Sequence, residues 1–166
     1  VRNPGGHSSR PRNDNAIYDL ANALVKIQDY QFPVNHNDLT LAFFQGIGKR
    51  TEGSLGKAMR DFSVDPDDKD AIAELRSHSS YVGTTGTTCV ATMLKAGHAE
   101  NALPQSAVAT VNCRVFPGTG VNETLMQLKE VVSNPAIEFQ MLAEPTETDP
   151  SPLRPDVLAA LQQAIN

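Results

Sequence analysis

Strict alternation of residue types over residues 106–116 is the feature that most constrains the fold of this chain. One set of alternate positions holds small apolar side chains, and the other set is mixed and partly polar. The first set is Ala107, Ala109, Val111, Cys113 and Val115, and the second is Val108, Thr110, Asn112, Arg114 and Phe116. Because successive side chains of a strand point to opposite faces, this pattern predicts a strand whose small apolar face packs on helices.

Further segments also have the character of strands. Residues 87–95 are rich in threonine, valine and small side chains and have no helix-capping pattern. Residues 136–143, with the sequence AIEFQMLA, alternate apolar and polar side chains. We expect both segments to be strands, and we expect residues 1–4 to form a first strand.

Helical patterns separate these strands. Asn13 or Asp14 is a plausible N-cap for a helix of about four turns. Its expected apolar stripe is Ile17, Leu20, Ala21, Leu24 and Val25. Residues 39–78 contain three short helical patterns, and a further helix is expected before Asn134. The buried stripe of this last helix is expected to be Leu125, Leu128, Val131 and Val132.

The order of the expected elements defines a fold class. A strand, a helix, two strands, a helix and a strand form the βαββαβ pattern of a ferredoxin-like α+β sandwich. This fold has a four-stranded antiparallel sheet with two helices on one face. Residues 1–166 are then one domain with a helical insertion at about residues 34–80. Residues 144–166 are expected to be a proline-rich linker and the start of a further helix.

Charge excludes two classes of partner. The net charge is −5, the pI is about 5.3, and no run of lysine and arginine is longer than two residues. Nucleic acids and anionic membranes are bound by clustered positive charge, so neither is an expected partner. The apolar stretches are also shorter than the roughly 20 residues that span a bilayer. We expect a soluble chain with small-molecule or protein partners.

The two cysteines do not form a metal-binding or redox motif. Cys89 and Cys113 lie in separate strand-like segments and lack CxxC spacing. They are therefore expected to be small buried hydrophobic residues. Two cysteines do not decide between a cytoplasmic and a periplasmic compartment.

Two short motifs fail as ligand sites. The GIGK sequence at residues 46–49 would need glycine at Phe43 and serine or threonine at Arg50 to match a phosphate-binding loop. The His36-Asn37-Asp38 stretch has the spacing of some zinc ligands but lacks a convergent third ligand. No metal site is therefore expected in this chain.

Three polar residues lie where packing does not require them. His7 follows two glycines near the start of the chain, Asn101 lies in a predicted turn, and Arg114 ends a predicted strand. Taken singly, they are explained as a solvated loop histidine, a turn residue before Pro104 and a surface ion-pair partner. From chemistry alone these structural roles remain open alternatives.

Taken together, three motifs resemble the dimerisation, or lid, domain of the zinc-dependent aminoacylase and carboxypeptidase superfamily. They are GGHSSRP at residues 5–11, NALPQSA at residues 101–107 and VNCRVFPG at residues 111–118. That superfamily includes acetylornithine deacetylase, succinyl-diaminopimelate desuccinylase and Gly-X carboxypeptidase. The resemblance covers nearly the whole chain and implies that it was excised from a larger metallopeptidase. The SPLRPDV sequence near the end resembles the return to the catalytic domain.

The resemblance implies roles for particular residues. A separate catalytic domain is expected to hold two zinc ions, and His7 is expected to reach into the active site of the partner subunit. There His7 would stabilise the oxyanion of the substrate. Gly5, Gly6 and Ser8 form the loop around this histidine. Asn101 and Arg114 are expected to contact the substrate in the same partner active site, Asn101 near its carboxylate or amide and Arg114 at its free carboxylate.

The implied function is that of a homodimeric lid domain in an amide hydrolase. Its substrate would be an N-acyl amino acid or a short peptide, and the isolated chain would be inactive because it holds no catalytic metal. The main alternative is a non-catalytic ferredoxin-like module that binds a small ligand or mediates association, since one fold serves many functions. A third reading is a scaffold whose parent has lost its metal ligands.

Overall fold

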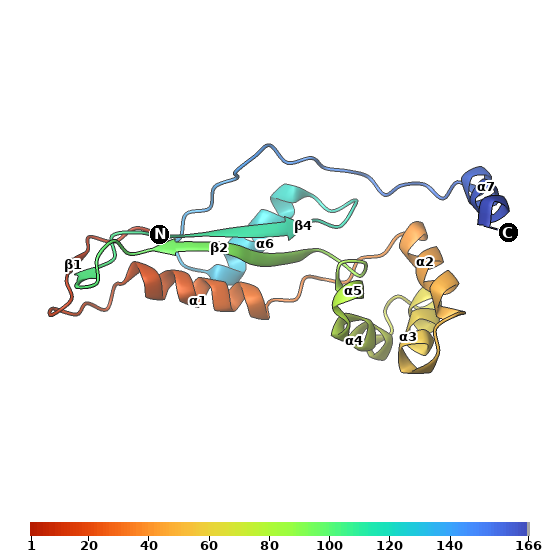
Figure 1. The fold of residues 1–166 in the computed structure, drawn as a ribbon, viewed down its shortest axis with the longest axis horizontal. Coiled ribbons are helices and arrows are strands. Elements are labelled where there is room, and N and C mark those ends of the chain that lie inside the picture. Colours follow the sequence, from red (N-terminus) through yellow and green to blue (C-terminus); the bar gives the residue numbers. More distant parts are fainter. Residues whose placement is uncertain (166) are drawn as a thin grey trace. The chain divides into compact units, whose positions relative to one another are not determined.

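The computed structural model describes residues 1–165 and divides the chain into two compact units. The sheet unit comprises Val1–Pro33, Thr87–Val115 and Thr119–Glu147. The helical unit comprises Val34–Gly86, Phe116–Gly118 and the segment from Thr148 onward. Seven helices and two small antiparallel sheets make the described residues a mixed α/β structure (Figure 1).

The sheet unit is built around a two-stranded antiparallel ribbon. Strands β2 (Thr88–Ala96) and β4 (Ala107–Arg114) pair along their lengths, with an irregularity between Ala91 and Met93. The alternation expected in β4 is confirmed, because Ala107, Val111 and Cys113 face hydrophobic clusters of this unit. The opposite face of the ribbon carries Val108 and Asn112, which are exposed.

Helices α1 (Ala16–Asp29) and α6 (Val121–Val132) pack on the small apolar face of the ribbon. The shared cluster contains Ala23, Ile27, Phe32, Leu128 and Val132, with Cys89, Val111 and Cys113 against it. In α6, Leu128 and Val132 are buried, as the sequence pattern predicts.

The buried face of α1 differs in part from the predicted stripe. The N-cap is Asn15, whose side chain accepts a hydrogen bond from the backbone N–H of Ile17. Leu20 is buried as expected, whereas Ile17 and Val25 are exposed. The residues that α1 buries are Ala16, Leu20, Ala23 and Ile27.

A second, shorter ladder lies near the start of the chain. Strand β1 (Gly6–His7) pairs with β3 (Ala102–Leu103) in antiparallel register. Residues 1–4, the expected first strand, are not a strand of their own. Arg2 forms an isolated bridge with Ser106, and the backbones of Val1 and Asn3 are hydrogen-bonded to those of Ala107 and Gln105. The glycine-histidine loop itself is therefore the first strand.

The four-stranded ferredoxin-like sheet is not confirmed, because the described residues form two separate two-stranded sheets. The strand expected at residues 136–143 is wrong: this segment joins neither sheet, and Ile137 donates its backbone N–H to the Asn134 carbonyl oxygen. Ile137 and Phe139 nevertheless pack against the core of the sheet unit. Alternation therefore decided which side chains face the core, but a strand also needs a neighbouring backbone to pair with.

The expectation of two separate buried cysteines is also wrong, because Cys89 and Cys113 form a disulfide. They lie directly opposite each other in the register of β2 and β4, with Cα atoms 4.1 Å apart. Their side chains share the face that packs on α1 and α6. Strand register therefore brings the two sulfur atoms together.

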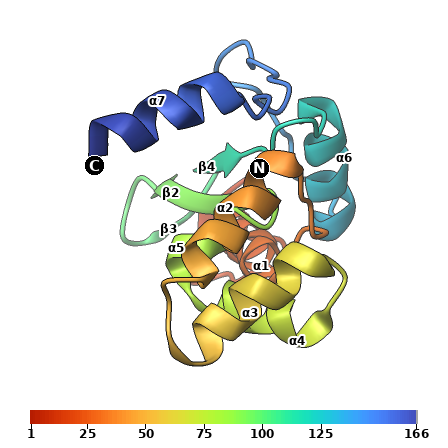
Figure 2. The same ribbon diagram turned by 90° about the vertical axis from the view of Figure 1, so that its right-hand side faces the viewer.

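The helical unit confirms the three helices expected within residues 39–78. They are α2 (Asp38–Gly48), α3 (Gly53–Val64) and α4 (Lys69–Ser77), followed by the short α5 (Ser79–Val82) (Figure 2). Asn37 caps α2 through a reciprocal pair of hydrogen bonds with Thr40. The core cluster is Phe44, Ala58, Met59, Phe62, Ala71 and Leu75. Helix α7 (Pro155–Ile165) ends the described part of the chain.

Candidate functional site

The β1–β3 ladder brings two of the three predicted site residues together. His7 on β1 lies opposite Ala102 on β3. The backbone N–H of Ser8 donates a hydrogen bond to the carbonyl oxygen of Asn101, at 3.0 Å. His7, Ser8 and Asn101 are all exposed. The loops that carry His7 and Asn101 therefore form one polar end of the sheet unit.

The two glycines before His7 have backbone conformations that favour glycine. Gly5 has φ = +76° and Gly6 has φ = +149°. A Cβ atom on Gly5 would lie 2.7 Å from the Cγ atom of Gln105 and 3.3 Å from the Leu103 carbonyl oxygen. The close approach at Gly5 is thus to residues of the same chain. Glycine here allows β1 to run beside the segment that contains β3.

A tight turn follows His7 and fixes the surroundings of its ring. The backbone N–H of Arg10 donates to the His7 carbonyl oxygen, at 3.0 Å. The Nδ1 atom of His7 lies 2.8 Å from Ser9 Oγ and accepts a hydrogen bond from the Ser9 backbone N–H at 3.2 Å. Sequence reasoning missed Ser9. The available signal was its spacing, two residues after the histidine and within reach of its ring.

Arg114 lies at the other end of the β2–β4 ribbon. It is the last residue of β4 and pairs with Thr88, the first residue of β2. Asn101 precedes β4, whose seven steps from Ala107 to Arg114 span about 24 Å at roughly 3.4 Å per residue. Arg114 is exposed, and among the described residues it forms no ion pair. One chain therefore does not bring Arg114 to His7 and Asn101.

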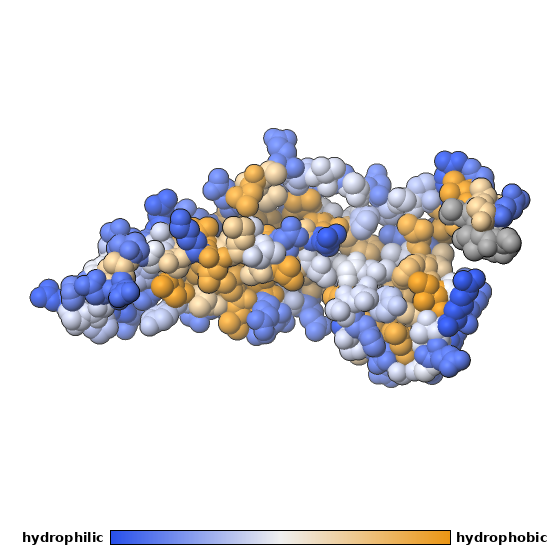
Figure 3. All heavy atoms as spheres, viewed as in Figure 1, coloured by the Kyte–Doolittle hydropathy of each residue, from blue (hydrophilic) through white to orange (hydrophobic). Residues whose placement is uncertain are grey.

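The face of the ribbon away from the helices carries exposed apolar side chains. Val90, Met93 and Val108 retain 59%, 69% and 61% of their surface. Val90 lies directly opposite Asn112, and Arg114 lies two residues further along β4. Figure 3 shows hydrophobic side chains gathered over the part of the sheet unit where β2 and β4 lie. In the described residues β2 pairs only with β4, so its outer edge is open.

One ion pair lies between the turn after His7 and helix α1. The Arg12 guanidinium donates two hydrogen bonds to the Asp14 carboxylate, of 2.8 and 2.9 Å. This hydrogen bonding lowers the pKa of Asp14 and raises that of Arg12. Both side chains are exposed, so the pair adds little to stability.

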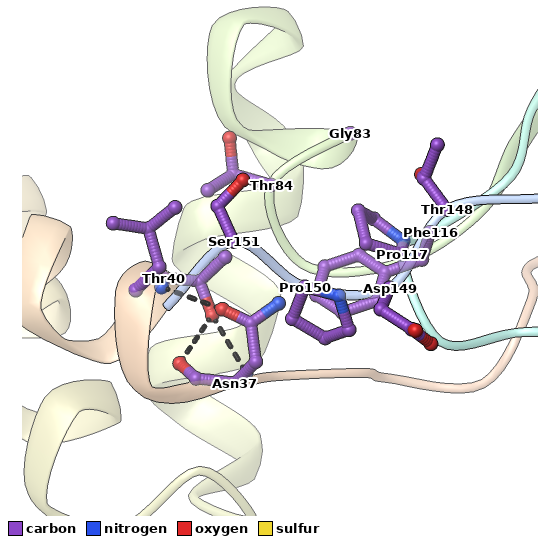
Figure 4. A pocket seen from close by; sticks show the side chains of 11 residues that line it. Asn37, Thr40, Gly83, Thr84, Phe116, Pro117, Thr148, Asp149, Pro150 and Ser151 are labelled. Carbon is purple, nitrogen blue, oxygen red and sulfur yellow. Dashed lines mark hydrogen bonds between the residues drawn. The ribbon is translucent and has the colours of Figure 1, made fainter. Parts of the chain in front are cut away.

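The helical unit contains a pocket that is separate from these residues. It has a volume of about 410 Å³ and is lined by the start of α2, residues 83–84, Phe116–Pro117 and residues 148–151 (Figure 4). Asn37 and Thr40, on its wall, are already bonded to each other. None of the predicted site residues lines this pocket.

Neither a metal-ligand cluster nor a membrane-spanning helix is found in the part of the chain that the structure describes. No group of three or more histidine, cysteine, aspartate or glutamate side chains there could hold a metal ion. His36 and Asp38 flank the cap of α2 and belong to no such group. None of the described helices combines the length and the apolar character needed to cross a membrane.

The sequence matches known proteins along most of its length. Residues 1–140 match the family model described as a peptidase dimerisation domain. The chain is 39% identical over 158 residues to the human N-fatty-acyl-amino acid synthase/hydrolase PM20D1, covering 93% of this chain and 30% of the relative. It is 27% identical over 152 residues to the Xenopus tropicalis protein of the same name, covering 91% and 29%.

A relative with a different name shows the same pattern. The chain is 27% identical over 146 residues to the probable carboxypeptidase S-like 2 of Dictyostelium discoideum, covering 88% of this chain and 28% of the relative. The chain thus spans 28–30% of the length of these three relatives. No solved structure matches it. The resemblance found in the sequence motifs is confirmed, and the chain belongs to the peptidase dimerisation domain family.

Proposed function

We propose that this chain is the dimerisation and lid domain of a dizinc hydrolase that cleaves an amide bond next to a free carboxylate. The observation that supports the proposal most directly is the β1–β3 ladder, which holds the loops of His7 and Asn101 side by side. Both side chains are exposed at the same end of the sheet unit. An exposed histidine beside an exposed amide is a suitable donor pair for a substrate bound by another chain.

The substrate class follows from the relatives and from Arg114. Two of the relatives are named for N-fatty-acyl-amino acids and one for a carboxypeptidase, and both names describe substrates with a free carboxylate. The Arg114 guanidinium can bind such a carboxylate with two parallel hydrogen bonds. We therefore propose an N-acyl amino acid or a short peptide as the substrate.

In this reaction His7 would act on the carbonyl oxygen. As the amide carbon becomes tetrahedral, negative charge develops on that oxygen, and an N–H of the imidazole would donate a hydrogen bond to it. One such donor contributes roughly 3 to 4 kcal/mol of barrier reduction. The two zinc ions expected in the parent would be held by a catalytic domain outside this chain, where they would activate water and polarise the carbonyl.

The proposed dimer brings the separated residues together. The edge of β2 is open in the described residues, and two copies that pair along this edge with two-fold symmetry would run antiparallel. The Ala96 end of one strand then lies beside the Thr88 end of the other. The His7 and Asn101 loops of one protomer would thus approach the Arg114 end of its partner.

The remaining parts of the chain have supporting roles in this proposal. Residues at about 34–80 are an insertion into the lid, and residues 144–166 lead back to the catalytic domain. The Cys89–Cys113 disulfide favours the periplasm over the cytoplasm as the compartment, because structural disulfides persist where the surroundings are oxidising.

Substitution of His7 tests the catalytic part of the proposal. In the full-length protein, His7→Ala should lower kcat at least about a hundredfold and leave the zinc content unchanged. His98→Ala is the matched control, since His98 is also exposed and lies in the neighbouring loop before β3. An unchanged kcat in His7→Ala would refute the oxyanion role and leave an association module.

Substitution of Arg114 tests the substrate class. Arg114→Ala should mainly raise KM for substrates with a free carboxylate and should have little effect on amidated analogues. Lys129→Ala is a suitable control, because Lys129 is an exposed cation of the same unit on α6, which packs on the opposite face of the ribbon. An equal loss on both kinds of substrate would show that Arg114 has only a structural role.

A further inference from the structure

We propose that Ser9 is a positioning residue for His7. It would hold the imidazole in the tautomer that carries its proton on Nε2, so that Nε2–H is available to donate to a substrate oxygen. This inference rests on the proposed function of His7 and adds the residue that sets the tautomer of its ring. Two hydrogen bonds from Ser9 to one ring nitrogen carry the argument.

The first bond favours one tautomer. The Ser9 backbone N–H points to Nδ1 of His7 at 3.2 Å, and a backbone N–H can only donate. Nδ1 accepts this bond through its lone pair. In a neutral imidazole with Nδ1 as the acceptor, the proton is on Nε2.

The second bond has the same direction. Ser9 Oγ lies 2.8 Å from Nδ1, and because that nitrogen carries no proton, the hydroxyl is the donor. Both donors come from one residue and reach the same ring atom. Among the described residues, Nε2 of His7 has no hydrogen-bond partner, so the opposite side of the ring is free.

The backbone around Ser9 keeps these donors in place. On one side the Ser8 N–H is bonded to Asn101, and on the other the Arg10 N–H is bonded to the His7 carbonyl oxygen. Ser8 differs from Ser9, because within the described part of the chain its hydroxyl makes no hydrogen bond to the ring. Ser8 is therefore a matched control in the same turn.

Loss of the Ser9 hydroxyl should change the balance of tautomers. With one donor to Nδ1 removed, the form with its proton on Nδ1 becomes populated, and in that form Nε2 accepts and cannot stabilise an oxyanion. Ser9→Ala should lower kcat roughly threefold to tenfold with KM unchanged, in keeping with the net contribution of one hydrogen bond. Ser9→Thr keeps a hydroxyl and should restore kcat.

The tautomer is measured directly by long-range ¹H–¹⁵N NMR of the full-length protein labelled with ¹⁵N-histidine. The His7 signals are assigned by their loss in His7→Gln. In the wild type, Nδ1 should have the chemical shift of an unprotonated nitrogen and Nε2 that of a protonated one. Ser9→Ala should shift both values toward a mixture, whereas Ser8→Ala and Ser9→Thr should not.

Two results would overturn the proposal. One is a wild-type His7 with its proton on Nδ1, and the other is a Ser9→Ala variant with the wild-type tautomer and kcat. Failure of the proposed function is a separate result, since it is read from an unchanged kcat in His7→Ala. The NMR measurement does not depend on activity and therefore tests the Ser9 contact by itself.

Discussion

The two units of this chain bury their apolar residues differently. In the helical unit, Phe44, Met59, Phe62 and Leu75 are completely buried by the helices of that unit. In the sheet unit, one face of the ribbon packs on two helices, and the other leaves Val90, Met93 and Val108 at 59–69% exposure. All the predicted site residues lie in the sheet unit. The unit with an uncovered face is thus the one suited to meet other chains.

The two units also differ in how their parts are joined. Helices α2, α3 and α4 follow one another in the sequence, and two of them have local side-chain caps, Asn37 and Asp68. The sheet unit joins distant segments, as shown by the mutual hydrogen bonds between the backbones of Val1 and Ala107. Pairing of distant segments costs chain entropy, so a cross-link such as Cys89–Cys113 stabilises the sheet unit more than it would the helical unit.

The largest expected loss of stability comes from the core of the helical unit. Phe62→Ala removes a fully buried ring that packs edge-on against Phe44, and it should cost about 3 to 5 kcal/mol of unfolding free energy. Hydrogen exchange should accelerate in α2, α3 and α4 and remain slow in β2 and β4. Val64→Ala is the control in the same helix, because Val64 is 84% exposed. Equal acceleration of hydrogen exchange in both units would contradict the view that each unit has its own core.

The next effect concerns the disulfide of the sheet unit. Reduction of Cys89–Cys113 opens a loop closed over a sequence separation of 24 residues, and it should lower stability by about 3 kcal/mol. Denaturant unfolding with and without a reducing agent measures this, with hydrogen exchange to locate it in β2 and β4. The double variant Cys89→Ala, Cys113→Ala should not respond to the reducing agent. The stabilising role of the disulfide is refuted if reduction leaves the unfolding free energy of the wild type unchanged.

The smallest effect compares one glycine from each unit. Gly5 and Gly53 have nearly the same positive φ, +76° and +75°, but only Gly5 has atoms near the site of a Cβ. Gly53→Ala should cost about 1 to 2 kcal/mol for the backbone conformation alone. Gly5→Ala should cost more, because its Cβ would meet Gln105. Equal changes in unfolding free energy in Gly5→Ala and Gly53→Ala would show that the close approach of Gly5 to Gln105 adds no constraint.

Much of the fold could be predicted because local chemistry decides it. Apolar spacing and turn residues located α2, α3 and α4, and Asn37 caps the first of them. The alternation in β4 assigned Val111 and Cys113 to the buried face. These features depend on residues that lie close together in the chain, so they can be predicted from one sequence alone.

Pairing between distant segments could not be predicted in the same way. The disulfide depends on the register that places Cys89 opposite Cys113, and neither spacing nor composition reveals that register. Residues 136–143 alternate like a strand but have no partner strand in the described structure. The motifs selected His7 and Asn101 as candidate site residues, whereas their proximity follows from the β1–β3 ladder, and the contact between Ser9 and the His7 ring follows from the turn after it.

The central claim is that one active site uses His7 from one protomer and Arg114 from the other. It is tested most directly by mixing full-length His7→Ala and Arg114→Ala proteins under conditions that allow subunits to exchange. The assay uses substrate below the wild-type KM, where each variant alone has low activity. Half of the reassorted dimers would be mixed, and each mixed dimer would have one intact site. The account predicts recovery to about a quarter of the wild-type activity. No recovery, although mixed dimers form, would contradict it and would show that both residues act within one chain or that neither serves the site.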